Sequence, residues 1–321
     1  MTERPEPKVS VVVPVRNARA WLEPVMTAIV AAAQRHGAAE IIAVDNGSTD
    51  GSLELLRRFP GVTTVSAPGI LVGAVRNRGA REARGRLLSF LDADCLVEPD
   101  YLLVAERTLE ERGAAATGSP YELPHRPGWI ESAWQRLHER GFEGWVGYVP
   151  AGNFFVRRAA FEEAGGFRED LSSGEDAELG QRMNDRGLRI WQSRAVSVRH
   201  LGNPGTLGAF FNKQVWHGEG MFGTVRPGEV DRPTAMMFLH AAMMLAAPAW
   251  LVAGRGPAGS RILVALAAVW LVPAVTVAFR LAASNAWSAA PAGLLLYQLY
   301  YLARLRALLR VLKTTVTRGS G

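Results

Sequence analysis

The chain has 321 residues, which is enough for one large domain or two ordinary ones. Its 48% hydrophobic and 21% charged residues are typical neither of a disordered chain nor of one embedded wholly in a membrane. The net charge of +6 does not indicate a nucleic-acid partner, because arginines on the surface and beside membrane segments account for it. The single cysteine, Cys95, excludes an internal disulfide framework and is typical of a reducing compartment.

The first 230 residues predict alternating strands and helices. In chain order the predicted elements are a strand at 9–13, a helix at 19–36, strands at 40–44 and 62–65 with a helix at 53–58 between them, a helix at 70–84 and a strand at 86–91. This alternation predicts an α/β fold with a parallel, doubly wound sheet. Ligands of such sheets bind beyond the carboxyl ends of the strands, where the polar stretches PVRN, DNGSTD and DADC fall.

Two acids, Asp92 and Asp94, follow the predicted strand at 86–91. No G-x-G-x-x-G follows the first strand and no G-x-x-x-x-G-K-[ST] occurs, so the two commonest phosphate-binding loops are absent. A diphosphate bound here would need a metal to carry its charge, and Mg²⁺ and Mn²⁺ prefer carboxylate oxygens. The alternative is a capped turn before Pro99, since any acid-rich turn supplies such a pair.

A second acidic stretch, DLSSGEDAELGQRMNDRG, spans residues 170–187. It predicts a helix that Ser172 or Ser173 caps and that has Asp176 in its first turn. Asp176 can act there as a general base, or it can simply complement the helix dipole. The residues alone leave both interpretations open.

Five stretches, taken together, resemble the family 2 glycosyltransferases of the GT-A fold. They are VSVVVPVRNARAWL, IIAVDNGSTDGS, GAVRNRGAREARGRLLSFLDADC, GNFFVRRAAFEEAGGF and SSGEDAELGQRMNDRG, and they occur in the family's order and spacing within residues 8–222. The resemblance implies a nucleotide-sugar donor, with uridine as the expected base. It also implies a divalent metal, Mg²⁺ or Mn²⁺, that neutralises charge on the departing diphosphate.

The resemblance carries roles over to the donor side of the site. Asp45 matches the acid that reads the base, and Pro14 and Asn17 line the nucleotide pocket. The family's basic helix near the base and phosphates corresponds to Arg76, Asn77 and Arg78. For each arginine a solvated helix face is the alternative.

Metal binding is likewise implied by the resemblance. Asp92 matches the acid that approaches the ribose, and Asp94 matches the acid that binds the metal. Asp92 and His200 are further candidate metal ligands. A structural or surface role is the alternative for His200, as for any lone histidine.

On the acceptor side, the resemblance implies an inverting transfer. Asp176 is the expected base and Glu175 a neighbouring acceptor contact, while Gly152 and Asn153 match the floor of the acceptor and donor-sugar site. Four residues in FFNKQVWHGEGMF are expected to close over the diphosphate, namely Lys213, Gln214, Trp216 and His217. The Gln-x-x-Arg-Trp motif of processive synthases is missing from this stretch, which favours transfer of one sugar per encounter.

After residue 232 the composition becomes apolar. We expect a catalytic domain at 1–232 and a membrane region at 233–321, with crossing helices at about 234–253 and 262–280. A third helix at about 289–313 is expected to lie along the membrane surface, and a third crossing is the alternative.

These segments predict a multi-pass protein of the inner, cytoplasmic membrane. Basic residues in the carboxy-terminal tail and the absence of a secretory signal predict a catalytic domain that faces the cytoplasm. The expected acceptor is a membrane lipid or lipid-linked glycan, and a homo-oligomer is left open. The alternatives are a processive polysaccharide synthase and a catalytically silent, nucleotide-binding scaffold.

Overall fold

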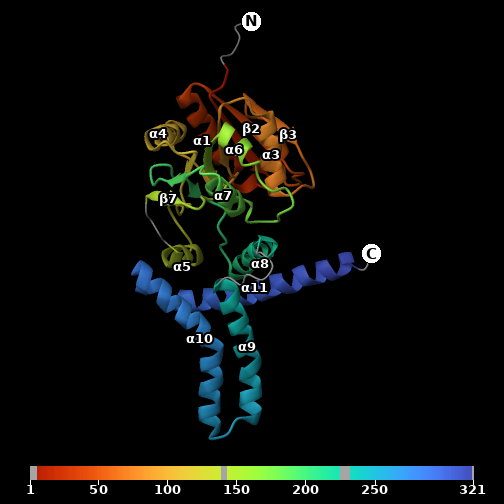
Figure 1. Ribbon diagram of the computed structural model, residues 1–321, viewed down its shortest axis with the longest axis vertical. Helices are drawn as coiled ribbons and strands as arrows, with labels where there is room; N and C mark the ends of the chain where they lie inside the picture. Colours follow the sequence, from red (N-terminus) through yellow and green to blue (C-terminus); the bar gives the residue numbers. More distant parts are fainter. Residues whose placement is uncertain (1–5, 139–142, 225–231, 320–321) are drawn as a thin grey trace. The chain divides into compact units, whose positions relative to one another are not determined.

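A computed structural model describes residues 6–138, 143–224 and 232–319 (Figure 1). The chain divides into two compact units. The sheet unit comprises Met1–His125 and Gly141–Asn203, and the helical unit comprises Arg126–Arg140 and Pro204–Gly321. The functional domain boundary expected at residue 232 stays a prediction.

The sheet unit is built on one eight-stranded sheet with the order β3-β2-β1-β4-β8-β6-β9-β7. Its strands are β1 (Val9–Val15), β2 (Ala39–Asp45), β3 (Val62–Ser66), β4 (Leu87–Leu91), β6 (Ala116–Gly118), β7 (Gly144–Val146), β8 (Asn153–Arg157) and β9 (Ile190–Gln192). The four predicted strands are present, and β3, β2, β1 and β4 are parallel as expected.

The other half of the sheet is mixed, so the parallel arrangement predicted from the first four strands does not extend to it. Strand β8 runs antiparallel to both β4 and β6, and β7 runs antiparallel to β9. The regular alternation of strand and crossover helix ends after α4 (Tyr101–Arg112), and three of the four later strands have only three residues. Short strands without crossover helices are free to pair in either direction.

Helices cover both faces of the sheet unit (Figure 1). They are α1 (Arg19–His36), α2 (Ser52–Leu56), α3 (Val72–Glu82), α4, α6 (Arg158–Glu163) and α7 (Glu175–Asp185). Val11 and Val13 of β1 are buried in a core with residues of α1 and α4, while Val12 between them is buried in a second core with residues of α3, α6 and α7. The unbroken run VSVVV follows from burial on both faces, and the predicted double winding is confirmed.

The carboxyl ends of β1, β2 and β4 lie at one edge of this sheet. Val15 pairs with Asp45 in register, and the N–H of Asn46 donates to Val15 O at 2.8 Å. Beyond β4, a two-stranded ladder joins β5 (Cys95–Leu96) to β10 (Arg199–His200). This ladder brings His200 beside the DADC turn, across more than a hundred residues of sequence.

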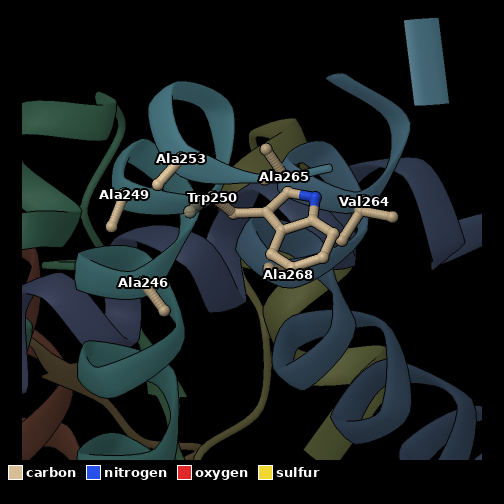
Figure 2. Close-up of a pocket in the computed structure, with 9 residues that line it drawn as sticks. Ala246, Ala249, Trp250, Ala253, Val264, Ala265 and Ala268 are labelled. Carbon is tan, nitrogen blue, oxygen red and sulfur yellow. The ribbon is translucent and has the colours of Figure 1, made fainter. Parts of the chain in front are cut away.

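The helical unit contains α5 (Trp129–His138), α8 (Leu207–Thr224), α9 (Arg232–Ala253), α10 (Ala258–Ser284), a 3₁₀ turn at Trp287–Ala289 and α11 (Ala290–Gly319). Helices α9 and α10 are long and apolar enough to cross a membrane, as expected for the segments near 234–253 and 262–280. They pack as a hairpin that holds an apolar pocket of about 410 Å³, lined by Ala246, Trp250, Val264 and Ala268 among others (Figure 2).

Gly79 of α3 provides a test of the packing beneath the site. A Cβ built there would overlap Val12 Cγ1 in the centre of the sheet and lie 3.1 Å from Val44 Cγ2. We expect Gly79→Ala to lower the free energy of unfolding by about 1–3 kcal/mol, through overpacking. In Gly147→Ala the new methyl meets no atom within 4 Å, so chemical denaturation should show a change within about 0.5 kcal/mol. Equal stability of the two variants would contradict this packing.

Candidate active site

Asn17 joins the loops that follow β1 and β2. Its φ of 50° lies in the left-handed region, which asparagine tolerates better than most residues. Its Oδ1 accepts a hydrogen bond from Thr49 N at 2.8 Å, and its own N–H donates to Ser48 Oγ at 3.0 Å. Asp45 is buried, and its carboxylate accepts from the N–H groups of Gly47 and Ser48 at 3.1 and 3.2 Å. The turn expected to hold the base is therefore ordered by its own polar groups.

Arg76 of α3 lies between two carboxylates. Its Nη2 donates to Asp92 Oδ1 at 2.6 Å, and its Nη1 donates to Glu175 Oε1 at 2.5 Å. The Arg76 and Glu175 side chains are only 5% and 6% exposed. Burial alone would lower the pKa of Arg76, but the charges of Asp92 and Glu175 outweigh it and raise that pKa. The bridge joins α3, the turn after β4 and the start of α7.

The other two residues of the expected basic stretch point elsewhere. Arg78 lies about 200° around α3 from Arg76 and forms a half-exposed ion pair with Glu82 at 2.8 Å. Asn77 donates from Nδ2 to Phe167 O at 2.7 Å and accepts at Oδ1 from Phe167 N at 3.0 Å. The structure therefore brings Arg76 to the carboxylates of Asp92 and Glu175. Asn77 instead binds the backbone of the Gly-Gly-Phe turn at residues 165–167, and Arg78 faces solvent.

Gly152 permits the close approach of Asp92 to the neighbouring loop. A Cβ at residue 152 would overlap Asp92 Oδ2 and would lie 2.5 Å from Tyr121 Oη. Asn153, which is fully buried, donates from Nδ2 to Val196 O at 2.9 Å and accepts from Tyr101 Oη at 2.8 Å. Gly152 thus leaves room for the side chains of Asp92 and Tyr121, whereas the amide of Asn153 forms hydrogen bonds within the protein interior.

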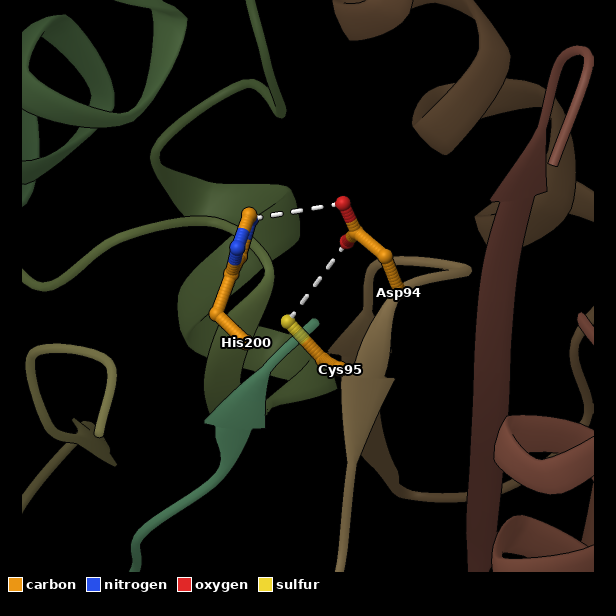
Figure 3. A group of neighbouring side chains, drawn as sticks. All are labelled: Asp94, Cys95 and His200. Carbon is orange, nitrogen blue, oxygen red and sulfur yellow. Dashed lines mark hydrogen bonds and ion pairs between the residues drawn. The ribbon is translucent and has the colours of Figure 1, made fainter. Parts of the chain in front are cut away.

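Asp94, Cys95 and His200 form a compact cluster on the β5–β10 ladder (Figure 3). His200 Nε2 lies 3.4 Å from Asp94 Oδ2, and the Cys95 thiol donates to Asp94 Oδ1 at 3.9 Å. Burial, followed by the negative charges of Asp92 and Asp94, raises the pKa of Cys95 well above its usual value. A Cβ at Gly202 would overlap Asp94 Oδ2, so only glycine leaves that carboxylate its position.

The donor atoms of this cluster fit a divalent cation. Two cis ligands of an octahedral Mg²⁺ or Mn²⁺ ion lie about 3 Å apart, close to the separation of Asp94 Oδ2 and His200 Nε2. A carboxylate with one imidazole also leaves coordination positions for water and phosphate oxygens, as these ions prefer. Asp92 is less suited as a ligand, because its Oδ1 is held by Arg76.

Asp176 lies in the first turn of α7, as expected. The predicted cap by Ser172 or Ser173 is wrong, because the N-cap is Gly174, whose φ of 81° only glycine adopts readily. Asp176 Oδ1 accepts from Ala177 N at 2.8 Å, and Oδ2 accepts from Ala151 N at 3.3 Å. Burial nevertheless raises the pKa of Asp176.

Tyr121 is a contributor that the sequence did not reveal. Its hydroxyl donates to Asp92 Oδ2 at 3.4 Å, and its ring lies 4.7 Å from the His200 ring, centroid to centroid. Tyr121 therefore contacts both Asp92, which is bound to Arg76, and His200, which lies beside Asp94. It lies between β6 and α5 in a segment without strand or helix periodicity, so no local pattern marks it.

The other residues predicted to bind the donor lie on β1 and α8. Pro14 lies in β1 opposite Val44 of β2. Lys213, Gln214 and Trp216 lie on α8 of the helical unit, where Gln214 is buried and Trp216 is partly exposed. Their contact with a diphosphate stays a prediction.

Comparison with known proteins bears directly on this site. Residues 10–165 match the family model Glycosyl transferase family 2, which covers the Asp45, Arg76 and Asp92–Asp94 segments. The protein contains a family 2 glycosyltransferase domain. It is therefore a glycosyltransferase, although Asp176 and His200 lie beyond the matched residues.

Individual relatives agree with the family match. The chain is 27% identical over 225 residues to glycosyltransferase AglE of Haloferax volcanii, covering 67% of this chain and 73% of AglE. It is also 29% identical over 182 residues to the succinoglycan biosynthesis protein ExoA of Rhizobium meliloti. This match covers 50% of the chain and 53% of ExoA.

A solved structure shares the fold. Mannosyltransferase PcManGT from Pyrobaculum calidifontis, in complex with GDP-Man and Mn²⁺, superimposes with a TM-score of 0.63 at 20% identity. The match covers 96% of this chain and 87% of PcManGT. The expected GT-A fold is thereby confirmed.

The two arginines of α3 form a matched pair for testing the bridge. Arg76→Gln leaves Asp92 and Glu175 without their cation, and we expect a loss of about 3–5 kcal/mol in the free energy of unfolding. Arg78→Gln removes an exposed i,i+4 pair, so its loss should stay within about 0.5 kcal/mol. Urea unfolding of both variants at pH 7 measures the difference. Similar losses would show that Asp92 and Glu175 do not need the charge of Arg76 to compensate theirs.

Proposed function

We propose that this glycosyltransferase moves a sugar from a nucleoside-diphosphate sugar to a membrane-associated, lipid-linked acceptor, with inversion of configuration, in glycan or polysaccharide assembly. The observation that carries the proposal is the division of three acids at one sheet edge. Asp92 is bound to Arg76, Asp94 lies beside His200, and Asp176 accepts only backbone N–H groups among the contacts described for it. Three environments support three different roles.

The donor half of the proposal rests on the ordered turn and on the relatives. Asp45 and Asn17 lie on the two loops that would enclose the base, with Arg76 and Asp92 next along the edge toward ribose and phosphates. PcManGT was solved with GDP-Man and Mn²⁺, which supports a nucleotide-sugar donor and a divalent metal. A uridine donor remains the expectation from the resemblance.

Asp94 and His200 would hold the metal, Mg²⁺ or Mn²⁺. When bound, such an ion supplies charge neutralisation to the departing nucleoside diphosphate. The Cys95 thiol donates to the Asp94 carboxylate, and glycine at residue 202 leaves room for that carboxylate. Asp92 stays with Arg76 and Tyr121, and from there it would contact the ribose of the donor.

Asp176 is the proposed base. Two backbone N–H groups orient its carboxylate, and its raised pKa makes it a stronger proton acceptor than an exposed aspartate. It takes the proton of the acceptor hydroxyl while that oxygen attacks C1 of the sugar, and the bond from C1 to the diphosphate breaks on the opposite face. Glu175 positions this turn by its ion pair with Arg76.

The lipid-linked acceptor is inferred from the helical unit. Helices α9 and α10 supply a membrane hairpin, and the basic helix α11 suits the cytoplasmic membrane surface. We place the catalytic domain on the cytoplasmic side, where nucleotide sugars are made. The absence of Gln-x-x-Arg-Trp in the α8 sequence favours a single transfer over processive synthesis.

Asp176→Asn separates donor binding from transfer. We expect the variant to bind its donor as wild type does and to lose about 10²–10⁴-fold in kcat, because the amide cannot accept the proton. Mass spectrometry of a panel of nucleotide sugars with Mn²⁺ and a membrane lipid extract identifies the donor first. The control is Asp170→Asn, an exposed acid paired with Arg168, which should keep its activity.

The pH dependence gives a second readout of the same base. Asp176 is protonated below its pKa and cannot then accept a proton. The wild-type rate should therefore fall as the pH drops through the pKa of Asp176, which lies above the usual aspartate value of 3.8. Normal turnover in Asp176→Asn would contradict the assignment. Donor binding by wild type without turnover on any donor would instead support a catalytically silent scaffold.

Gly202→Ala tests the metal site without changing a charge. The new methyl displaces the Asp94 carboxylate, and a displaced ligand should weaken apparent Mn²⁺ affinity by about 10–100-fold. In Gly205→Ala the methyl meets no atom within 4 Å, so Mn²⁺ affinity should match wild type. Mn²⁺ titration of donor binding, followed by calorimetry, measures both. Unchanged affinity in Gly202→Ala would exclude Asp94 as a ligand in this position.

A further inference from the structure

Arg304 of α11 is a buried cation in the helical unit. Helix α8 packs along α11, and an apolar cluster of Phe211, Val215, Ala303 and Ala307 lies between them. Arg304 lies one turn from Ala307 on this side of α11 and is only 9% exposed. Its charge is therefore withdrawn from water at the contact between two helices.

The guanidinium of Arg304 lacks the partners that a buried cation needs. Within the part of the chain that the structure describes, its Nε and Nη1 are buried and have no hydrogen-bond partner. The guanidinium lies 4.8 Å from the centroid of the Tyr300 ring, a contact that attracts the charge but leaves the Nε and Nη1 donors without an acceptor. An unpaired buried charge is strongly unfavourable, so a ligand that accepts these donors would be bound firmly.

Gly218 of α8 makes room for this group. A Cβ at residue 218 would lie 2.6 Å from Ala307 Cβ and 3.2 Å from both Cδ and Nη1 of Arg304. Any larger residue would press on the guanidinium. The close approach of the two helices thus depends on glycine at the point where the unpaired donors lie.

The charged groups around Arg304 do not neutralise it. Helix α11 has no acidic residue, and the single acid of α8, Glu219, is paired with Arg310 at 3.0 Å. His217 on α8 has a pKa lowered to about 4, by burial and then by the positive charges of Lys213 and Arg304. The described surroundings of Arg304 on α8 and α11 are therefore positive and lack a free carboxylate.

The geometry points to an anion site at Arg304, between α8 and α11, that takes the phosphate group of a lipid. The guanidinium fork matches phosphate oxygens, and the 9% of Arg304 that stays exposed leaves a route to it. Helix α11 also packs against α9 and α10, so a phosphate at this level can keep its hydrocarbon chain beside the apolar hairpin. The inference rests on the proposed function, because it assigns a binding group for the lipid-linked acceptor.

Calorimetry on the full chain in neutral detergent tests the site, with farnesyl monophosphate as the probe. We expect wild type to bind it and Arg304→Gln to bind it at least about tenfold more weakly, as for loss of charge-assisted hydrogen bonds. Arg306→Gln is the matched control: Arg306 is exposed on the same helix, over Phe211 at 5.7 Å, and should bind within about twofold of wild type. Equal affinity in Arg304→Gln and wild type would overturn the assignment.

Two further ligands separate the sources of the signal. Farnesol lacks the phosphate and should bind far more weakly, and equal binding would mean that only the chain is recognised. Inorganic pyrophosphate should not displace farnesyl monophosphate at equal concentration. Full displacement would show a site for a soluble diphosphate and would overturn the lipid assignment.

Donor binding, measured on the same samples, keeps this inference apart from the proposed function. Intact donor binding with unchanged farnesyl-phosphate affinity in Arg304→Gln overturns only the inference, whereas a wild type that binds no nucleotide sugar overturns the proposed function. If Arg304→Gln does not fold, the thermal stability of the wild-type protein provides the test. The Tm of wild type must rise with farnesyl monophosphate and not with farnesol, and equal shifts in Tm would overturn the site.

Discussion

The guanidinium of Arg76, held between Asp92 and Glu175, is the interaction on which the site depends. It joins α3, the turn after β4 and the start of α7, which lie 16 and 99 residues from Arg76 along the chain. Removing three charged groups from water costs several kcal/mol per ion, and an apolar replacement can stabilise a fold as well. The bridge is therefore better explained by the positions that it imposes on the acids than by a contribution to stability.

Its main consequence is to separate the acids at one sheet edge. Asp92 is engaged by Arg76, which leaves Asp94 to turn toward His200 on the β5–β10 ladder. Glu175 is engaged as well, so Asp176 is the acid of α7 whose carboxylate accepts backbone N–H groups at the described contacts. In the proposed function, these four acids would supply a donor contact, a metal ligand, a positioning group and a base. The glycines at 152 and 202 permit this crowding, because any side chain there would displace a carboxylate.

Much of this arrangement could be predicted from the sequence. The apolar runs at β1, β2 and β4 identify strands buried on both faces, and polar residues at their ends identify the edge. The sequence did not show whether Arg76 or Arg78 points into the site. Side chains two residues apart on a helix point in nearly opposite directions, and only the packing of the helix decides which one lies inward. The mixed half of the sheet was missed because its strands are too short to show a period. The position of Tyr121 depends on contacts with distant segments, which no local pattern encodes.

The central claim is that Arg76 keeps Asp92 from the metal and that Asp94 and His200 bind it. A crystal structure of the chain with Mn²⁺ and a nucleoside diphosphate, with anomalous scattering recorded at the manganese edge, tests this most directly. We predict a single anomalous peak bonded to Asp94 and His200, with Asp92 still paired to Arg76. A peak bonded to Asp92, with the Arg76 ion pair broken, would contradict it.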